Sequence, residues 1–165
     1  NASRGKIWGK YITWNIILGN GRYDIGVYDL ENNQIIEISN PENAIRGNPD
    51  INKARIVYSH RKNGISSIRM FNLETNEKRI IYKTALDNVG RPALSNKYVV
   101  WSQSPKDEKH IGGVMGINIK TDEIFEVQEQ GPHSNSVTTP DIYQNTTVWK
   151  AWRSGNGDIY GSVLK

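Results

Sequence analysis

The stretch Asn48–Ser59, NPDINKARIVYS, decides the fold, because the chain repeats it in varied form four times. Its hydrophobic run ends on Tyr58, and three similar runs elsewhere end on Trp14, Trp101 and Trp149. The four aromatic residues are 44, 43 and 48 residues apart. Short strands that recur every roughly 40–50 residues are typical of a β-propeller, in which each repeat forms one four-stranded blade.

Other elements keep their positions within the repeat. Nine residues before each aromatic residue stands Pro49, Pro92, Pro140 or Gly5. Proline is tolerated where a strand begins or lies at an edge, so a first strand is expected here. A third strand of the type Ser67–Leu73 follows the aromatic strand, and in three copies a polar turn leads into a fourth strand. We therefore expect four antiparallel blades, the last of them incomplete, with repeats at about 5–39, 40–83, 84–130 and 131–165.

The aromatic positions are expected to pack between blades. Apolar residues alternate with a period of two in these strands, which suits one strand face packed on the next blade. A row of rings that stack on a ligand is the alternative, but recurrence at one structural position favours the core. The first strands are expected to be innermost, so that four equivalent apolar residues face alike near the axis: Ile7, Ile51, Leu94 and Ile142.

The same residues carry a family resemblance. The pattern Asn48–Ile51, Arg55–Ser59 and Ile68–Leu73 resembles the TolB-like propeller repeat, in a variant found in secreted and cell-surface proteins of bacteria and archaea. The resemblance runs from about Lys6 to Leu164 and departs from the pattern at Ala93. It implies a propeller fold and a role in binding a protein or a surface ligand.

The composition agrees with a single all-β unit. The 165 residues include 15 Gly and 8 Tyr, and no long segment has the apolar periodicity of a helix. The absence of Cys excludes disulfides and thiol chemistry. The net charge of +4 is spread along the chain, which argues against a nucleic-acid partner. No apolar run approaches the roughly 20 residues of a membrane-spanning helix.

The last repeat stops after its third strand, and only Asn1–Arg4 precede the expected first strand at Gly5. We therefore expect a piece of a larger propeller. An outer edge of blade four with unpaired N–H and C=O groups predicts either a homo-oligomer or edge-strand pairing with another chain.

The candidate ligand site lies in the expected loops of one propeller face. These loops include residues 15–23, 40–48, 60–66, 83–91, 103–112, 128–139 and 151–157. Arginine forks suit carboxylate or phosphate, and an exposed Trp can stack on a sugar ring. The alternative is that polar residues collect in loops because loops are solvated. The candidate ligand-binding residues are Arg46, His60, Arg61, Arg91, His133, Trp152 and Arg153.

No residue set predicts catalysis, a metal site or a cofactor. The three histidines, His60, His110 and His133, lack the short spacing of metal motifs, and no Gly-x-Ser-x-Gly elbow occurs. The segment Gly19–Gly21 joins two strands, so it predicts a hairpin and no dinucleotide cradle. We therefore expect a non-catalytic module that binds a protein or carbohydrate, in a periplasmic, extracellular or cell-surface protein. The alternative is the propeller portion of an exported hydrolase, a peptidase or lyase, whose catalytic residues lie outside this chain.

Overall fold

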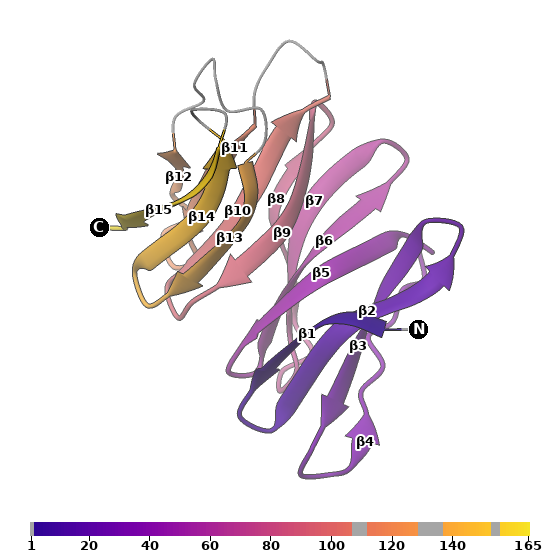
Figure 1. Ribbon diagram of the computed structural model, residues 1–165. Coiled ribbons are helices and arrows are strands. Elements are labelled where there is room, and N and C mark those ends of the chain that lie inside the picture. The colour runs from indigo at the N-terminus through magenta and orange to yellow at the C-terminus, as the bar shows by residue number, and fades with distance from the viewer. Residues whose placement is uncertain (1, 107–111, 129–136, 153–155) are drawn as a thin grey trace.

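The computed structural model describes residues 2–106, 112–128, 137–152 and 156–165. Every regular element within these residues is a β-strand, and the strands form antiparallel sheets in sequence order (Figure 1). The described part of the chain contains no helix that could cross a membrane. The predicted all-β propeller of four successive blades, with a three-stranded last blade, is confirmed.

Each blade is one sheet. Blade 1 contains β1 (Ala2–Trp8), β2 (Tyr11–Gly19), β3 (Arg22–Asp29) and β4 (Gln34–Ile35). Blade 2 contains β5 (Ile45–Asn52), β6 (Arg55–Lys62), β7 (Ile65–Asn72) and β8 (Lys78–Thr84). Blade 3 contains β9 (Asp87–Leu94), β10 (Tyr98–Pro105), β11 (Gly113–Asn118) and β12 (Ile124–Gln128). Blade 4 contains β13 (Val137–Tyr143), β14 (Thr146–Trp152) and β15 (Gly157–Val163).

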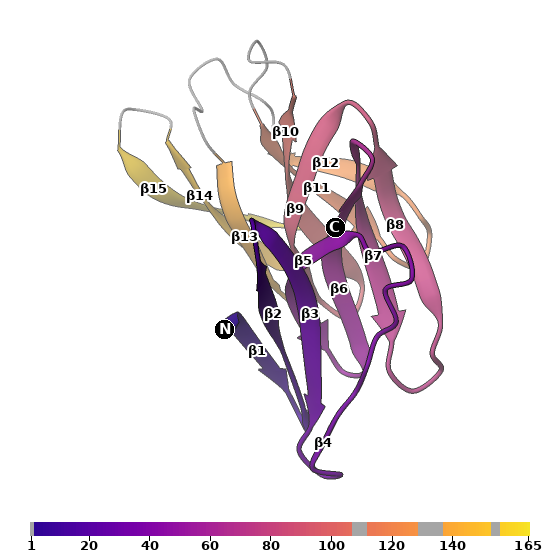
Figure 2. The same cartoon turned by 90° about the vertical axis from the view of Figure 1, so that its right-hand side faces the viewer.

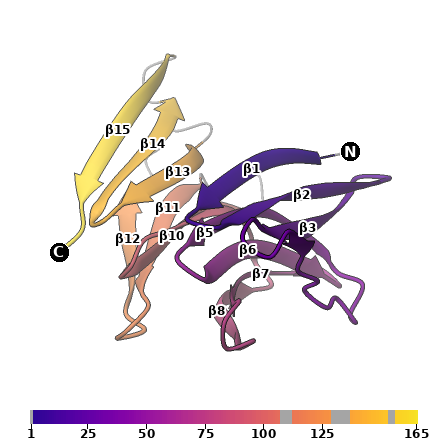
Figure 3. The same ribbon diagram turned by 90° about the horizontal axis from the view of Figure 1, so that it is seen from below.

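The blades radiate from a common axis. Seen along that axis, the first strand of each blade is innermost and the later strands lie progressively further out (Figure 3). Blades 1 and 4 end the row, and their inner strands β1 and β13 lie on the same side of the fold (Figure 2). The inner strands therefore determine what lines the axis.

Several strands are longer than the sequence suggested. The turns Asn20–Gly21 and Asn63–Gly64 have positive φ at both residues, as two-residue hairpin turns require. Such turns continue the strand ladder, so β2 reaches Gly19 and β6 reaches Lys62. The expected loops at residues 15–23 and 60–66 are thus wrong, although the hairpin at Gly19–Gly21 is confirmed.

The hydrophobic core lies between successive blades. Three of the repeated aromatic residues, Tyr58, Trp101 and Trp149, are buried in the three clusters that join the blades. The Trp101 ring stacks on Tyr82 of the preceding blade with ring centroids 5.1 Å apart. Trp14, on the outward face of blade 1, is only half-buried. The predicted packing between blades is confirmed for the three that have a preceding blade.

The inner apolar residues are equivalent, as expected. Each of them pairs with the second residue of the next strand: Ile7, Ile51, Leu94 and Ile142. Three of them are buried, whereas Ile7 is 64% exposed. As with Trp14, the difference arises because no preceding blade in the described chain covers blade 1.

Candidate functional site

Each inner strand carries an irregularity at the same place in the repeat. The residue before Gly5, or before the proline of the other three repeats, has a positive φ. This angle is 55° at Arg4, 52° at Asn48, 50° at Arg91 and 48° at Thr139. The strand register shifts at or opposite this residue in all four blades. A β-bulge of this kind kinks the strand and re-aims a side chain.

The repeat itself explains where the bulge falls. A bulge leaves one residue outside the ladder, and proline, which has no N–H to donate, fits beside it without loss of a hydrogen bond. Asparagine adopts left-handed angles readily, whereas Arg and the β-branched Thr seldom do. Backbone of this kind concentrates at functional sites. The bulges at Arg4, Arg91 and Thr139 therefore mark the axis as a candidate site.

A second layer of side chains lies two residues further along each inner strand. The Nζ atom of Lys6 lies 3.7 Å from a carboxylate oxygen of Asp50 and 3.4 Å from one of Asp141. The other oxygen of Asp50 accepts a hydrogen bond of 2.7 Å from the backbone N–H of Leu94. Burial raises the pKa of the Asp50 carboxyl, against the effects of that hydrogen bond and of Lys6. This layer joins blades 1, 2 and 4 through charge.

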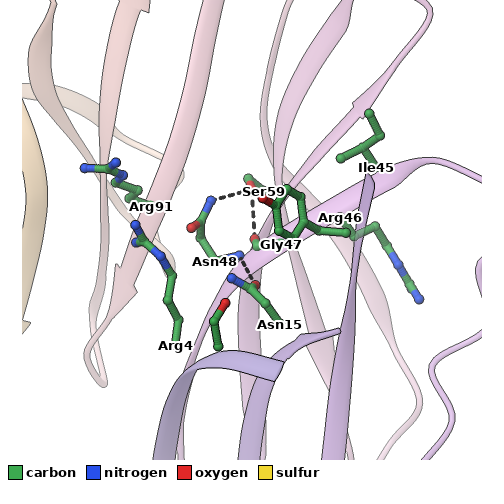
Figure 4. Close-up of a pocket in the computed structure, with 10 residues that line it drawn as sticks. Arg4, Asn15, Ile45, Arg46, Gly47, Asn48, Ser59 and Arg91 are labelled. Atoms are coloured by element: carbon green, nitrogen blue, oxygen red, sulfur yellow. Dashed lines mark hydrogen bonds between the residues drawn. The ribbon is translucent and has the colours of Figure 1, made fainter. Parts of the chain in front are cut away.

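Three adjoining cavities surround the bulge residue of blade 2. Their volumes are about 280, 220 and 240 Å³, and Asn48 lines all three. The second cavity is lined by residues of all four blades, including the four bulge residues. We call these three cavities around Asn48 the axial depression. Figure 4 shows the first of them, with Arg4, Asn48 and Arg91 around it.

Hydrogen bonds hold the centre of the axial depression in place. The backbone N–H of Asn48 donates to Oδ1 of Asn15 at 2.7 Å, which ties blade 2 to blade 1. The side-chain amide of Asn48 donates to Oγ of Ser59 at 3.4 Å, and that hydroxyl donates to the carbonyl of Gly47 at 2.8 Å (Figure 4). These groups line the cavity from strands, not from loops.

The candidate Arg46 lies in β5 and is 4% exposed, so its expected place in a loop is wrong. Its Nε donates to Asp24, and its Nη2 donates to the carbonyl of Ile38 at 2.8 Å. Figure 4 shows its side chain directed away from Arg4 and Arg91. Arg46 therefore lines the axial depression, but its guanidinium binds groups within the protein.

The candidate His60 lies in β6 and is buried, so its expected place in a loop is wrong. Its Nδ1 lies 3.5 Å from Oγ of Ser67, and its Nε2 lies 3.7 Å from a carboxylate oxygen of Glu42. Burial lowers the pKa of His60, and the charge of Arg69 lowers it further. This Ser–His–Glu series has the order of a catalytic triad, but Ser67 is 2% exposed and cannot reach a substrate from that position.

The remaining candidate residues lie in strands or outside the described part of the chain. Arg61 is exposed in β6 and lines the cavity of about 240 Å³, and Arg91 lies half-buried in β9, so their expected loop positions are also wrong. Trp152 ends β14, so its expected loop position is wrong as well, and its side chain lies outside the described part of the structure. His133, Arg153 and the non-candidate His110 lie outside the described residues.

Sequence reasoning missed most residues of the axial depression, among them Arg4, Asn48 and Ser59. The first strand begins at Ala2, not at Gly5, so Arg4 belongs to blade 1. A usable signal existed, since Arg4 precedes Gly5 as Asn48 and Arg91 precede their prolines. Among the residues that the structure describes, no group of three His, Cys, Asp or Glu side chains could hold a metal ion.

Comparison with known proteins places the fold. No family model and no curated protein sequence matches the chain. TolB from Acinetobacter baumannii superposes with a TM-score of 0.66 at 15% identity, over 86% of this chain and 35% of that one. The propeller domain of the Trilobed protease from Pyrococcus furiosus superposes with a TM-score of 0.65 at 13% identity, over 99% of this chain and 57% of that one.

The fold is a TolB-like β-propeller. A puromycin-hydrolysing peptidase from Mycobacterium tuberculosis is also similar, with a TM-score of 0.68 at 9% identity over 95% of this chain and 26% of that one. At such low identities, the similarity shows the TolB-like propeller fold and no more. The chain spans about a third of the length of TolB and somewhat over half of the length of the Trilobed protease domain.

Proposed function

We propose that this chain is a non-catalytic binding module of an exported or cell-surface protein, and that its protein or carbohydrate ligand occupies the axial depression. One observation carries the proposal: a single depression, centred on Asn48, has lining residues from all four blades. Binding sites are concave and contain a few well-placed polar groups. The amide of Asn48 and the hydroxyl of Ser59 are such groups.

The way the depression is built also supports binding. Its side chains project from hydrogen-bonded inner strands, and Asn15 ties two of those blades together. A ligand would therefore order little of the protein when it binds, which favours affinity. A location outside the cytoplasm is proposed from the resemblance to repeats of secreted proteins and from the similarity to TolB.

The second candidate function is the propeller portion of an exported hydrolase. The observation that favours it is the presence of peptidases among the similar structures, including an acylaminoacyl peptidase and the puromycin-hydrolysing enzyme. In that case the axial depression would present or admit substrate, and the chemistry would take place outside this chain. The buried Ser67 agrees with either function.

The test fills the axial depression. Gly90 lines the cavity of about 240 Å³, and a Cβ added there meets no atom within 4 Å. Gly90→Trp should therefore fold and fill space that the ligand needs. Glu74→Trp, at the exposed turn between β7 and β8, adds the same ring far from the depression.

Both variants and the unmodified protein are screened on a glycan array and a display library of peptides. We expect a ligand whose binding is lost in Gly90→Trp and kept in Glu74→Trp. A ligand that binds all three proteins equally well would place the binding surface elsewhere. A peptide ligand would suit both candidate functions, whereas a glycan ligand would exclude a peptidase role for the depression.

A further inference from the structure

Two arginines meet at the axis, and neither has a carboxylate partner among the residues that the structure describes. Arg4 makes no hydrogen bond or ion pair with any described residue, although it lines two of the three cavities. Arg91 lines the same two cavities and donates from Nη1 to the hydroxyl of Thr139 at 2.9 Å. Figure 4 shows both guanidinium groups on the same side of the cavity.

The layer beneath this pair offsets only part of its charge. Asp141 is the acidic residue that lines the cavity of about 220 Å³. Its carboxylate lies 3.4 Å from Nζ of Lys6. The buried Asp50 is also engaged by Lys6 and by the backbone of Leu94. Three cationic side chains therefore face two carboxylates, and neither arginine forms an ion pair with a described carboxylate.

The positive charges of the two arginines repel each other. Burial lowers the pKa of Arg91, and the charge of Arg4 lowers it further. Like charges held close together in a partly desolvated site repel, and an anion placed between them removes that cost. A guanidinium group presents paired N–H donors that fit the oxygens of carboxylate or phosphate.

We propose that Arg4 and Arg91 bind an anionic oxygen group, a carboxylate or a phosphate, on the ligand of the axial depression. The inference rests on the proposed function and names the chemistry of its ligand. The amide of Asn48, which lines the same two cavities, supplies a further donor for the anion. The bulges provide the geometry, because they place residues from three different blades in one layer.

The repeat supplies a matched neutral replacement. Asn48 occupies the position of Arg4 and Arg91 in blade 2, with nearly the same φ. Arg4→Asn and Arg91→Asn should therefore keep the backbone and remove only the guanidinium. Lys83→Asn removes one positive charge from an exposed residue of β8 that lines none of the three cavities.

The probes are inorganic phosphate and malonate, titrated at constant ionic strength while amide chemical shifts are followed by NMR. We expect saturable shifts at Asn48, Arg91 and Thr139. Each single variant should weaken binding about tenfold, since a hydrogen bond to a charged group contributes on that scale. The double variant should lose binding, and Lys83→Asn should change it less than twofold.

A preference for phosphate or for malonate identifies which group the ligand carries. Non-saturable shifts, equal binding by the double variant, or an equal loss in Lys83→Asn would each overturn the inference. The outcome is separable from the proposed function. A ligand lost in Gly90→Trp but unaffected by Arg4→Asn and Arg91→Asn overturns the anion site alone. Saturable phosphate binding, with a macromolecular ligand indifferent to Gly90→Trp, overturns the proposed function alone.

Discussion

The Nζ atom of Lys6, in blade 1, lies 3.4 Å from a carboxylate oxygen of Asp141, in blade 4. The two residues are 135 positions apart in the chain, so this contact links the first and last blades across the axis. The same Nζ lies 3.7 Å from Asp50, which is mostly buried. One lysine therefore screens two acidic residues from each other.

Lys6→Met should destabilise the protein at neutral pH, because Asp50 and Asp141 would then face each other without a cation. Both Lys6 and Asp141 are well exposed, so solvent screening limits the loss to about 1 kcal/mol of unfolding free energy. Urea unfolding measures it. Lys83→Met, the same change at an exposed position of β8, is the control. An equal effect of both changes would contradict an electrostatic role for Lys6.

Trp101→Ala should cost about 3–5 kcal/mol of unfolding free energy, because a fully buried ring that stacks on Tyr82 is removed. Trp14→Ala changes the equivalent residue of blade 1, which is only half-buried, and should cost less than half as much. Chemical denaturation of the two variants gives the comparison. Similar losses at the two positions would mean that burial between blades is not the source of the stability that these aromatic residues contribute.

Arg46→Met should destabilise by about 3 kcal/mol, since Asp24 would lose its partner in a partly buried ion pair. Two backbone carbonyls, those of Ile38 and Ser39, would lose a donor as well. Arg61→Met removes an exposed arginine of the next strand and should change stability by no more than about 0.5 kcal/mol. Thermal and urea unfolding of both variants measure the change in stability. An Arg46→Met variant as stable as the unmodified protein would contradict a structural role for Arg46.

The protein should lose stability as the pH falls from about 7 to 5. Burial and the charge of Arg69 hold the pKa of folded His60 below its ordinary value of 6.5. Below pH 6.5 the unfolded chain takes up a proton that the folded chain does not, so the free energy of unfolding decreases. The fall should stop near the lowered pKa of the folded state.

Urea unfolding at pH 7, 6 and 5 measures this dependence in the unmodified protein and in His60→Gln. The variant should show a flatter curve. Burial raises the pKa of Asp50, which acts in the opposite sense, but it does so in both proteins and cancels in the comparison. Parallel curves would show that His60 titrates normally.

Much of the fold was predictable from the sequence. The third strand of blade 3 forms as β11, although the run from Gly112 to Gly116 departs from the repeat. Strand extent was predicted less well. Asn63–Gly64 was placed within a loop, although its left-handed hairpin turn extends β6 and β7 and brings His60 and Arg61 into a strand.

The candidate site was predictable only in part. Arg91 was singled out, but Arg4 was overlooked because the first strand was expected to start at Gly5. Arg46 and Arg91 are the same residue type in neighbouring blades, yet one is paired with Asp24 and the other faces the cavity. Residue type alone does not distinguish them.

The sequence by itself determined the number of blades and the order of the strands. These follow from local features: the alternation of apolar residues, the aromatic strand ends and the prolines. Only the tertiary structure decided which polar side chains meet at the axis. Arg4 and Arg91 are 87 residues apart in the chain. Whether an arginine there is neutralised depends on what lies across the axis, because pairing and desolvation are set by distance in space and not by position in the repeat.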